Sequence, residues 1–274
     1  MSPSPSSVKL TPILSCATVF IDAPHVLQPA DLPGGTAQSS GTNLASFGAS
    51  EAANANEDPA LTPRAWWKVN ADKTVAYGLR EAIEVVRDVL KARTFDGVLG
   101  FSQGAAFASI ISSLLERPHL YEPFLVDGKP PHPPFKFCVA VSGFRLRDPF
   151  CDSLYEPQYT TPTLHVIGKN DVIVHEERSR LLVDASANAR VEEHDGGAHL
   201  HPFTFNAFFR GSHVAPLSLS GHFMPSKRNW LKFIRGYMVD PSADLPSPSL
   251  AASSAPASGT ATPTELSATT IMKL

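Results

Sequence analysis

Apolar residues follow two alternating patterns along this chain: short continuous runs, and longer stretches with helical spacing. The short runs are rich in β-branched and aromatic residues and predict strands, because a strand buried on both faces reads as a nearly continuous apolar run. The longer stretches place apolar side chains three or four positions apart with charges between them, which predicts amphipathic helices. We expect strands at 17–23, 95–101, 135–144, 162–168 and 189–196, and helices at 74–93, 105–115, 175–187 and 225–238.

This alternation of strands and helices predicts the fold class. Strands that alternate with helices form crossover units, and crossover units build a mostly parallel sheet with helices on both faces. We therefore expect an α/β fold. A chain of 274 residues is long enough for two domains, but α/β folds of this size are often one domain. We place a single domain at 17–239.

Three regions lie outside the alternating pattern. Residues 1–16 form a low-complexity, irregular N-terminal segment, and residues 240–274 are rich in Pro, Ser, Ala and Thr. Such segments have too few apolar side chains to offset the entropy lost on ordering, so we expect the tail at 240–274 to be disordered. Residues 34–63 are rich in Gly, Ala, Ser and Asn without periodicity, which predicts a long flexible surface loop.

Charge and cysteine content exclude several function classes. The formal net charge of -3 provides no basic field for nucleic acid and no polybasic membrane patch. Three cysteines without a Cys-x-x-Cys pair argue against a disulfide framework or a zinc cluster and suit a reducing compartment. No apolar run reaches the ~18 residues of a membrane span, and the first residues are a poor signal peptide. We expect a cytoplasmic location, with the nucleus as a second one.

The strand at 95–101 runs into a Gly-x-Ser-x-Gly sequence. Residues 100–104 read Gly-Phe-Ser-Gln-Gly, with an apolar run before them and a small-residue helical pattern after them. In such a strand–turn–helix the serine is held in a strained turn with its Oγ exposed at the carboxyl edge of the sheet, and a Cβ on either glycine would clash. We therefore predict Ser102 as a nucleophile. The N–H of Gln103, at the helix N-terminus, is the expected oxyanion donor.

A reactive serine also needs an acid and a base, which follow it along the chain in this architecture. Asp171 comes three residues after Gly168 and is the expected acid, with a solvated turn aspartate as the alternative reading of the same residues. The base is expected to be a histidine after the strand at 189–196. Position alone slightly favours His199, because it lies nearer that strand. Four further histidines are also candidates for the base: His194, His201, His213 and His222. His194 is the weakest of them, because it lies within the expected strand.

Several stretches of the chain together resemble one family. In order they are FIDAPHVLQPADLP, RAWWKVN, FDGVLGFSQGAAFA, CVAVSGFR, TPTLHVIGKNDVIV, HDGG and GHFMPSKRNWLKFIRGYM. The chain resembles the FSH family of serine hydrolases, small eukaryotic esterases and thioesterases of the α/β-hydrolase fold that are common in fungi. The resemblance implies Ser102 as the nucleophile and Asp171 as the acid. It also implies His222 as the base, because His222 matches the family's Gly-Gly-His pattern and the helix that follows it, whereas His199 does not.

The chain departs from the family pattern in two places. The family runs from HDGG directly into HFMP, whereas here an atypical insert, 198–221, intervenes. The family also begins with a strand, beside the nucleophile strand, that ends in a His-Gly loop. We expect this chain to lack that strand, because the residues before Ala17 cannot replace it. The loss would also remove one oxyanion N–H, a donor worth about 3–4 kcal/mol of transition-state stabilisation.

These residues predict a serine hydrolase that cleaves carboxylic esters or thioesters through an acyl-enzyme, with no metal or organic cofactor. The expected partner is a small acyl ester or thioester, without nucleic acid. The alternative is a catalytically impaired hydrolase-fold remnant that acts as a binding or scaffold protein. Four aromatic residues are predicted to contact the substrate: Phe101, Trp66, Trp67 and Phe144. For the two tryptophans, packing against the loop at 34–63 is an equally good alternative. For Phe144, loop packing is the favoured reading.

Overall fold

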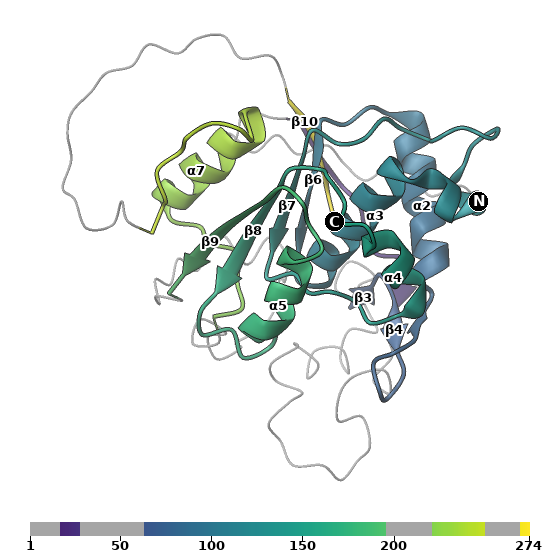
Figure 1. Cartoon of the computed structure of the whole chain (residues 1–274), viewed down its shortest axis with the longest axis horizontal. Coiled ribbons are helices and arrows are strands. Elements are labelled where there is room, and N and C mark those ends of the chain that lie inside the picture. Colours follow the sequence, from purple (N-terminus) through teal and green to yellow (C-terminus); the bar gives the residue numbers. More distant parts are fainter. Residues whose placement is uncertain (1–16, 28–62, 196–220, 250–268) are drawn as a thin grey trace, which may run out of the picture.

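The computed structural model describes residues 17–27, 63–195, 221–249 and 269–274. At its centre is a six-stranded parallel sheet with the strand order β1-β10-β6-β7-β8-β9 (Figure 1). The strands β6 to β9 lie side by side in chain order, as successive crossover units predict. The strands of the sheet are β1 (Ala17–Phe20), β6 (Gly97–Phe101), β7 (Phe137–Val141), β8 (Thr163–Gly168), β9 (Ala189–His194) and β10 (Thr270–Lys273).

Helices cover both faces of the sheet. The helix α7 (Arg228–Val239) packs on one face, and α2 (Leu79–Ala92), α3 (Gln103–Glu116) and α4 (Pro149–Tyr155) lie on the other (Figure 1). Successive strand residues point to opposite faces, so each strand contributes to two apolar clusters. In β6, Val98 joins the cluster with α2, α3 and α4, whereas Leu99 joins the cluster with α7. The predicted parallel α/β sheet with helices on both faces is therefore confirmed.

The predicted elements are found, with shifted bounds. The helix expected at 74–93 begins at Leu79, because Gly78 adopts a left-handed φ of 83° that ends the preceding turn. Val75, which lies within the range expected for this helix, precedes the observed helix and is 40% exposed. The pattern gave no sign of α4 or of four strands too short to carry a periodicity, which form two antiparallel pairs: β2 (His25–Val26) with β3 (Arg64–Ala65), and β4 (Lys68–Val69) with β5 (Ala76–Tyr77).

The largest departure from expectation is β10. We predicted that residues 240–274 are disordered, and for Thr269–Leu274 this is wrong, since they supply a strand between β1 and β6. We also expected the chain to lack the family's first strand, whose place is beside the nucleophile strand. A segment from the far end of the chain fills that place. Residues 241–249 also lie within the described part of the chain and follow α7 as turns and irregular backbone.

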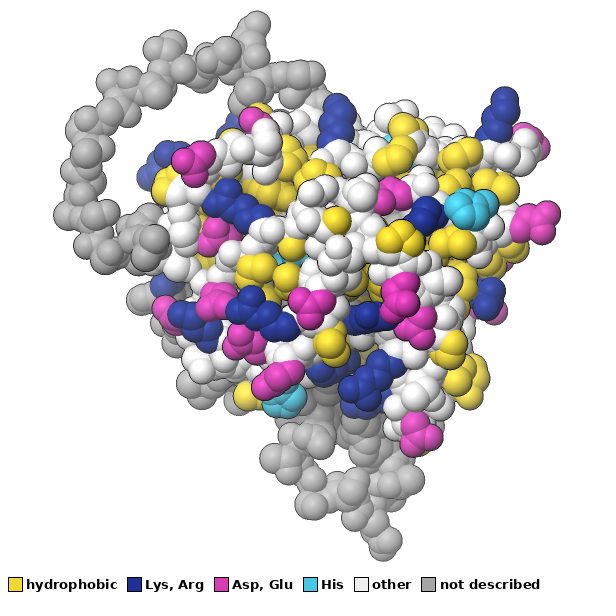
Figure 2. Space-filling view, viewed as in Figure 1, with side chains coloured by type: hydrophobic (Ala, Val, Ile, Leu, Met, Phe, Trp, Pro, Cys, Tyr) yellow, Lys and Arg dark blue, Asp and Glu magenta, His cyan; other side chains and the backbone are white. Residues whose placement is uncertain are grey.

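Other sequence-based expectations fall on residues that the structure does not describe. They concern the segment at 1–16, the loop at 34–63 except Pro63, and the insert at 198–221 except Gly221. Within the described ranges, no helix is both long and apolar enough to cross a membrane. Basic and acidic side chains lie interspersed on the face of the molecule drawn in Figure 2.

Candidate active site

The Gly-x-Ser-x-Gly sequence forms the predicted strand–turn–helix. Strand β6 ends at Phe101, and α3 begins at Gln103 with Ser102 as its N-cap. Ser102 has a φ of 53°, a left-handed value that costs a non-glycine residue free energy unless the surroundings impose it. Its N–H donates to the carbonyl of Val141 in β7 at 2.8 Å, which ties the turn to the neighbouring strand. The turn therefore holds the serine at the carboxyl edge of the sheet.

The two glycines of this turn are needed for different reasons. A Cβ on Gly100 would lie 2.2 Å from the carbonyl oxygen of Gly104, so the strand and helix can approach only without it. A Cβ on Gly104 would lie 2.5 Å from the backbone oxygen of Leu274, directly after β10. The first glycine permits the tight turn, and the second permits contact with a distant segment.

Ser102, His222 and Asp171 form a hydrogen-bonded row. His222 Nε2 lies 3.0 Å from Ser102 Oγ, and His222 Nδ1 lies 2.8 Å from Asp171 Oδ2. The other carboxylate oxygen of Asp171 accepts the N–H groups of Ile173 and Val174 at 2.9 and 2.8 Å. Three elements separated by long stretches of sequence thus bring their side chains to one place.

Backbone contacts bring His222 to the aspartate. Gly221 has a φ of 68°, and a Cβ on it would lie 2.4 Å from the carbonyl carbon of Asn170. A Cβ on Gly168 would in turn lie 2.2 Å from the Gly221 oxygen. The two glycines let the segment before His222 lie against the turn that carries Asp171. Sequence reasoning noted the glycine before His222 but did not assign it this packing role.

The environment of Asp171 favours its ionised form. Burial by itself raises the pKa of this carboxyl, since a charge is costly to remove from water. The hydrogen bond from His222 and the N–H groups of Val174 and Ile173 outweigh burial, and together they lower the pKa below its usual value. An ionised carboxylate beside Nδ1 favours the tautomer with its proton on that nitrogen, so that Nε2 is the nitrogen that accepts a proton from Ser102.

Gln103 links the turn to the two tryptophans. Its side-chain Oε1 accepts the N–H of Trp66 at 2.7 Å, and its Nε2 donates to the carbonyl of Trp67 at 3.0 Å. As the first residue of α3, its own N–H has no acceptor four residues earlier in the helix. The side-chain role was not predicted, because two hydrogen bonds to residues 36 and 37 positions away leave no local signal.

The four predicted aromatic contacts have different surroundings. Trp66 and Trp67 are 4% and 2% exposed, and Trp66 stacks on Phe107 with a centroid distance of 4.4 Å. Both tryptophans therefore pack in the core beside α3. The ring of Phe101 lies 4.9 Å from that of His222, and the guanidinium of Arg178 lies 4.4 Å over the ring of Phe144. Contact of any of the four with a substrate stays a prediction.

The remaining histidine candidates do not join the row within the described residues. His194, in β9, is buried and packs against the rings of Phe223 and Trp230. His199, His201 and His213 lie outside the described residues.

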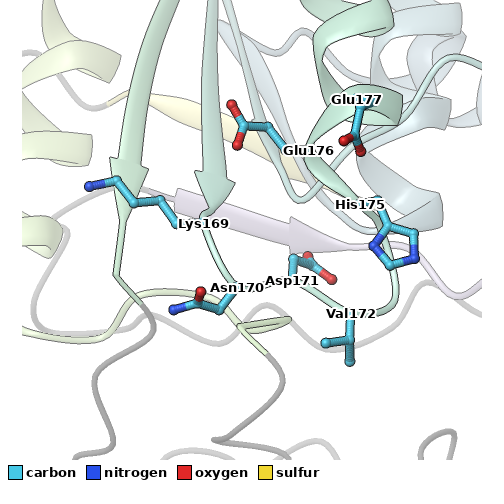
Figure 3. Close-up of a pocket in the computed structure, with 7 residues that line it drawn as sticks. All are labelled: Lys169, Asn170, Asp171, Val172, His175, Glu176 and Glu177. Carbon is cyan, nitrogen blue, oxygen red and sulfur yellow. The ribbon is translucent and has the colours of Figure 1, made fainter.

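A hollow of about 380 Å³ lies beside the turn that carries Asp171 (Figure 3). The residues of α5 (Glu176–Val183) bound it on one side and the end of β8 on the other. Neither Ser102 nor His222 is among the residues that line it. It is lined by Lys169, Asn170, Asp171, Val172, His175, Glu176 and Glu177.

Comparison with known proteins places this site in a family. Residues 7–207, more than half of the chain, match the family described as serine hydrolase (FSH1). The chain belongs to the FSH1 family of serine hydrolases. Ser102 and Asp171 lie inside the matched residues of this FSH1-family chain, and His222 lies after them.

Several curated proteins are similar to this FSH1-family chain. Esterase OVCA2 of Danio rerio is 34% identical over 208 residues, which are 70% of this chain and 82% of that protein. Dihydrofolate reductase of Schizosaccharomyces pombe is 36% identical over 138 residues, or 50% of this chain and 29% of that protein. Esterase GA18864 of Drosophila pseudoobscura pseudoobscura is 30% identical over 68% of this chain and 55% of that protein. The matched part of the chain thus covers from 29% to 82% of the length of these relatives.

Among solved structures, acyl-protein thioesterase 2 of Zea mays is 21% identical to this FSH1-family chain. The alignment covers 48% of this chain and 64% of that chain, with a TM-score of 0.35.

Proposed function

We propose that this chain hydrolyses carboxylic esters or thioesters, with Ser102 as the nucleophile. The observation that carries the proposal is the row from Asp171 Oδ2 through His222 to Ser102 Oγ, with distances of 2.8 and 3.0 Å. A serine hydroxyl is a weak nucleophile until a base takes its proton, and a histidine oriented by a carboxylate is suited to that task. Membership of a serine hydrolase family and relatives named esterases support the same reaction.

The reaction begins at the Ser102 hydroxyl. His222 Nε2 takes the Oγ proton while Oγ forms a bond to the carbonyl carbon of the substrate. The imidazolium, stabilised by Asp171, then gives that proton to the departing alcohol or thiol as the old ester bond breaks. Water attacks the resulting acyl-enzyme by the same route, which releases the acid and restores Ser102.

The negative oxygen that forms during both steps needs hydrogen-bond donors. The N–H of Gln103, at the N-terminus of α3, is the donor we propose, because it adjoins Ser102 and the helix dipole favours negative charge there. The N–H of Leu274, at the end of the strand that fills the place beside β6, already donates to Leu99 at 2.9 Å. We therefore assign it no part in binding the oxyanion.

Labelling with a fluorophosphonate tests this proposal, since the reagent modifies only a serine that is activated as a nucleophile. The folded wild-type chain is expected to be labelled, and Ser102→Ala to show no labelling. Ser153→Ala, which removes an exposed hydroxyl from α4, is the matched control and should react like wild type. A folded wild-type chain that does not react would contradict the proposal and favour the non-catalytic alternative.

A further inference from the structure

The segment Thr269–Leu274 is hydrogen-bonded on both sides. Towards β1, the N–H of Ala17 donates to Thr269 and the N–H of Ile21 donates to Lys273, at 3.0 and 3.1 Å. Its backbone groups thus pair with strand β1 of the same chain in the way that a central strand requires.

The other side of the segment bonds to β6 and to the residue before it. The Asp96 carboxylate accepts the N–H of Thr270 and the Asp96 N–H donates to Thr270, both at 2.7 Å. The N–H of Leu274 donates to Leu99 at 2.9 Å. Asp96 therefore binds the beginning of β10 through both its side chain and its backbone.

The two side chains in the middle of the segment bury on opposite faces of the sheet. Ile271 is 2% exposed and joins the cluster under α7, whereas Met272 is fully buried in the cluster with α2 and α3. Burying two such side chains supplies about 3–6 kcal/mol, by the usual range of 1.5–3 kcal/mol each. The strand position between β1 and β6 thus offers one apolar pocket on each face of the sheet, filled by two consecutive residues.

Within the described part of the chain, β1 pairs with the sheet through β10 alone. The residues between Ser249 and Thr269 number 19 (268 − 250 + 1), and 19 extended residues reach about 60 Å. A domain of roughly 220 residues has a radius of gyration of about 17 Å, so this connection alone leaves much of the surface within reach. Strand pairing and side-chain burial, rather than the covalent connection, therefore determine where the segment binds.

We propose that the channel between β1 and β6 is a peptide-binding site. In this structure its occupant is the chain's own segment Thr269–Leu274, and the site accepts the same sequence as a separate peptide in the same parallel register. The recognition is the addition of a strand: backbone hydrogen bonds supply affinity, and the pockets for Ile271 and Met272 supply selectivity. The inference goes beyond the proposed function and holds whether or not Ser102 reacts with an ester.

The occupant also touches the turn that carries Ser102. The backbone oxygen of Leu274 would lie only 2.5 Å from a Cβ on Gly104, so it packs directly against this glycine. Occupation of the channel thus supports the beginning of α3. Any effect of the bound segment on the reactivity of Ser102 rests on the proposed function. Binding of the segment can be measured without it.

Cleavage of the folded full-length chain tests the site. A protease recognition sequence replaces residues 256–262, and the protein is cut after folding. We expect the released fragment, detected by mass, to co-elute with the remainder in gel filtration. A fluorescent peptide of the sequence TTIMKL should then exchange into the cut protein. A fragment that elutes separately, or a peptide that does not bind, would overturn the proposal.

Matched variants show whether the pockets decide binding. In Met272→Lys the cut fragment should be lost, because an ammonium would replace a fully buried apolar side chain. Leu181→Lys places the same charge at a 43% exposed position of α5, and its fragment should be retained. Retention of both fragments would contradict the assigned pocket.

A disulfide in the uncut chain tests the register without relying on these variants. Thr18 pairs with Ile271, and neighbouring strands lie about 4.8 Å apart, within the range that a disulfide spans. In a Cys16→Ser background, Thr18→Cys with Ile271→Cys should form an intrachain bond. Thr18→Cys with Lys273→Cys, two positions out of register, should not. A disulfide-linked dimer would overturn the assignment to the chain's own segment.

Discussion

The two halves of the central sheet are assembled in different ways. Strands β6 to β9 come from consecutive crossover units and pair with neighbours in chain order. Strands β1 and β10 pair with each other in parallel although they come from opposite ends of the sequence. The first half is local in sequence, whereas the second depends on a contact between residues that are more than 200 positions apart.

This difference separates the chemistry of the site from the support beneath it. Ser102 and Asp171 follow directly from β6 and β8, in the local half. The glycine that follows the serine turn, Gly104, packs against Leu274 in the distant half. A reactive group can thus be encoded locally while its support comes from elsewhere, and variants in the two halves should fail in different assays.

The largest effect is expected from His222→Ala, which removes the proposed base and leaves the sheet intact. Hydrolysis of a simple ester should fall about 10⁴-fold or more, in line with removal of a residue that acts as part of a catalytic unit. The urea midpoint should change little. His199→Ala is the control and should keep its activity; loss of activity in that variant instead would reassign the base.

Met272→Ala should show the opposite behaviour, with a large loss of stability. Deleting a fully buried methionine side chain leaves a cavity and costs about 2–5 kcal/mol of unfolding free energy. Leu181→Ala, at a 43% exposed position, should stay within about 0.5 kcal/mol of wild type. Urea unfolding followed by circular dichroism measures both, and equal stability of the two variants would argue that β10 adds nothing to the sheet.

Gln103→Ala tests the hydrogen bonds between the serine turn and the tryptophans. The variant leaves the N–H of Trp66 and the carbonyl of Trp67 without their side-chain partner, and an unpaired buried polar group costs about 1–3 kcal/mol. The matched control is Gln158→Ala, which removes a hydrogen bond to Asp184 at an exposed site. If both variants unfold at the same urea concentration, the bonds of Gln103 do not stabilise the turn.

The smallest effect is expected from acid. Burial raises the pKa of Asp96, but its bonds to Lys136 and Thr270 outweigh burial and lower it below the usual value of 3.8. A carboxyl whose pKa is lowered by folding stabilises the fold fully above pH 3.8, and this contribution is lost as the pH falls through the lowered value. The urea midpoint of wild type should therefore fall more steeply below pH 4 than that of Asp96→Asn. Parallel curves for the two proteins would exclude this linkage.

Prediction from sequence succeeded where the signal is local. The apolar run before Ser102 and the small residues after it were enough to expect a strand, a turn and a helix, because steric rules for a tight turn act within a few residues. The choice of His222 over His199 needed the family resemblance, since both histidines follow a glycine or alanine on a polar stretch. Only folding shows that Gly221 contacts the Asp171 turn.

Other features left no local signal. Thr269–Leu274 follows a long Pro, Ser, Ala and Thr-rich stretch, and a run of six residues with three large apolar ones is too short to show a period. The same applies to Gln103, whose side chain reads as an exposed polar residue until Trp66 and Trp67 are placed beside it.

The sequence by itself determined the parallel α/β fold, the serine turn and the residue types that surround it. Hydrophobic periodicity and glycine sterics act over a few positions, so they are readable along the chain. Only the tertiary structure decided which strand stands beside β6 and how the side chain of His222 reaches the serine. The physical reason is that these arrangements depend on complementarity between distant segments. The hydrogen bonds between Asp96 and Thr270 and the apolar pockets on two faces exist only once the other strands are in place.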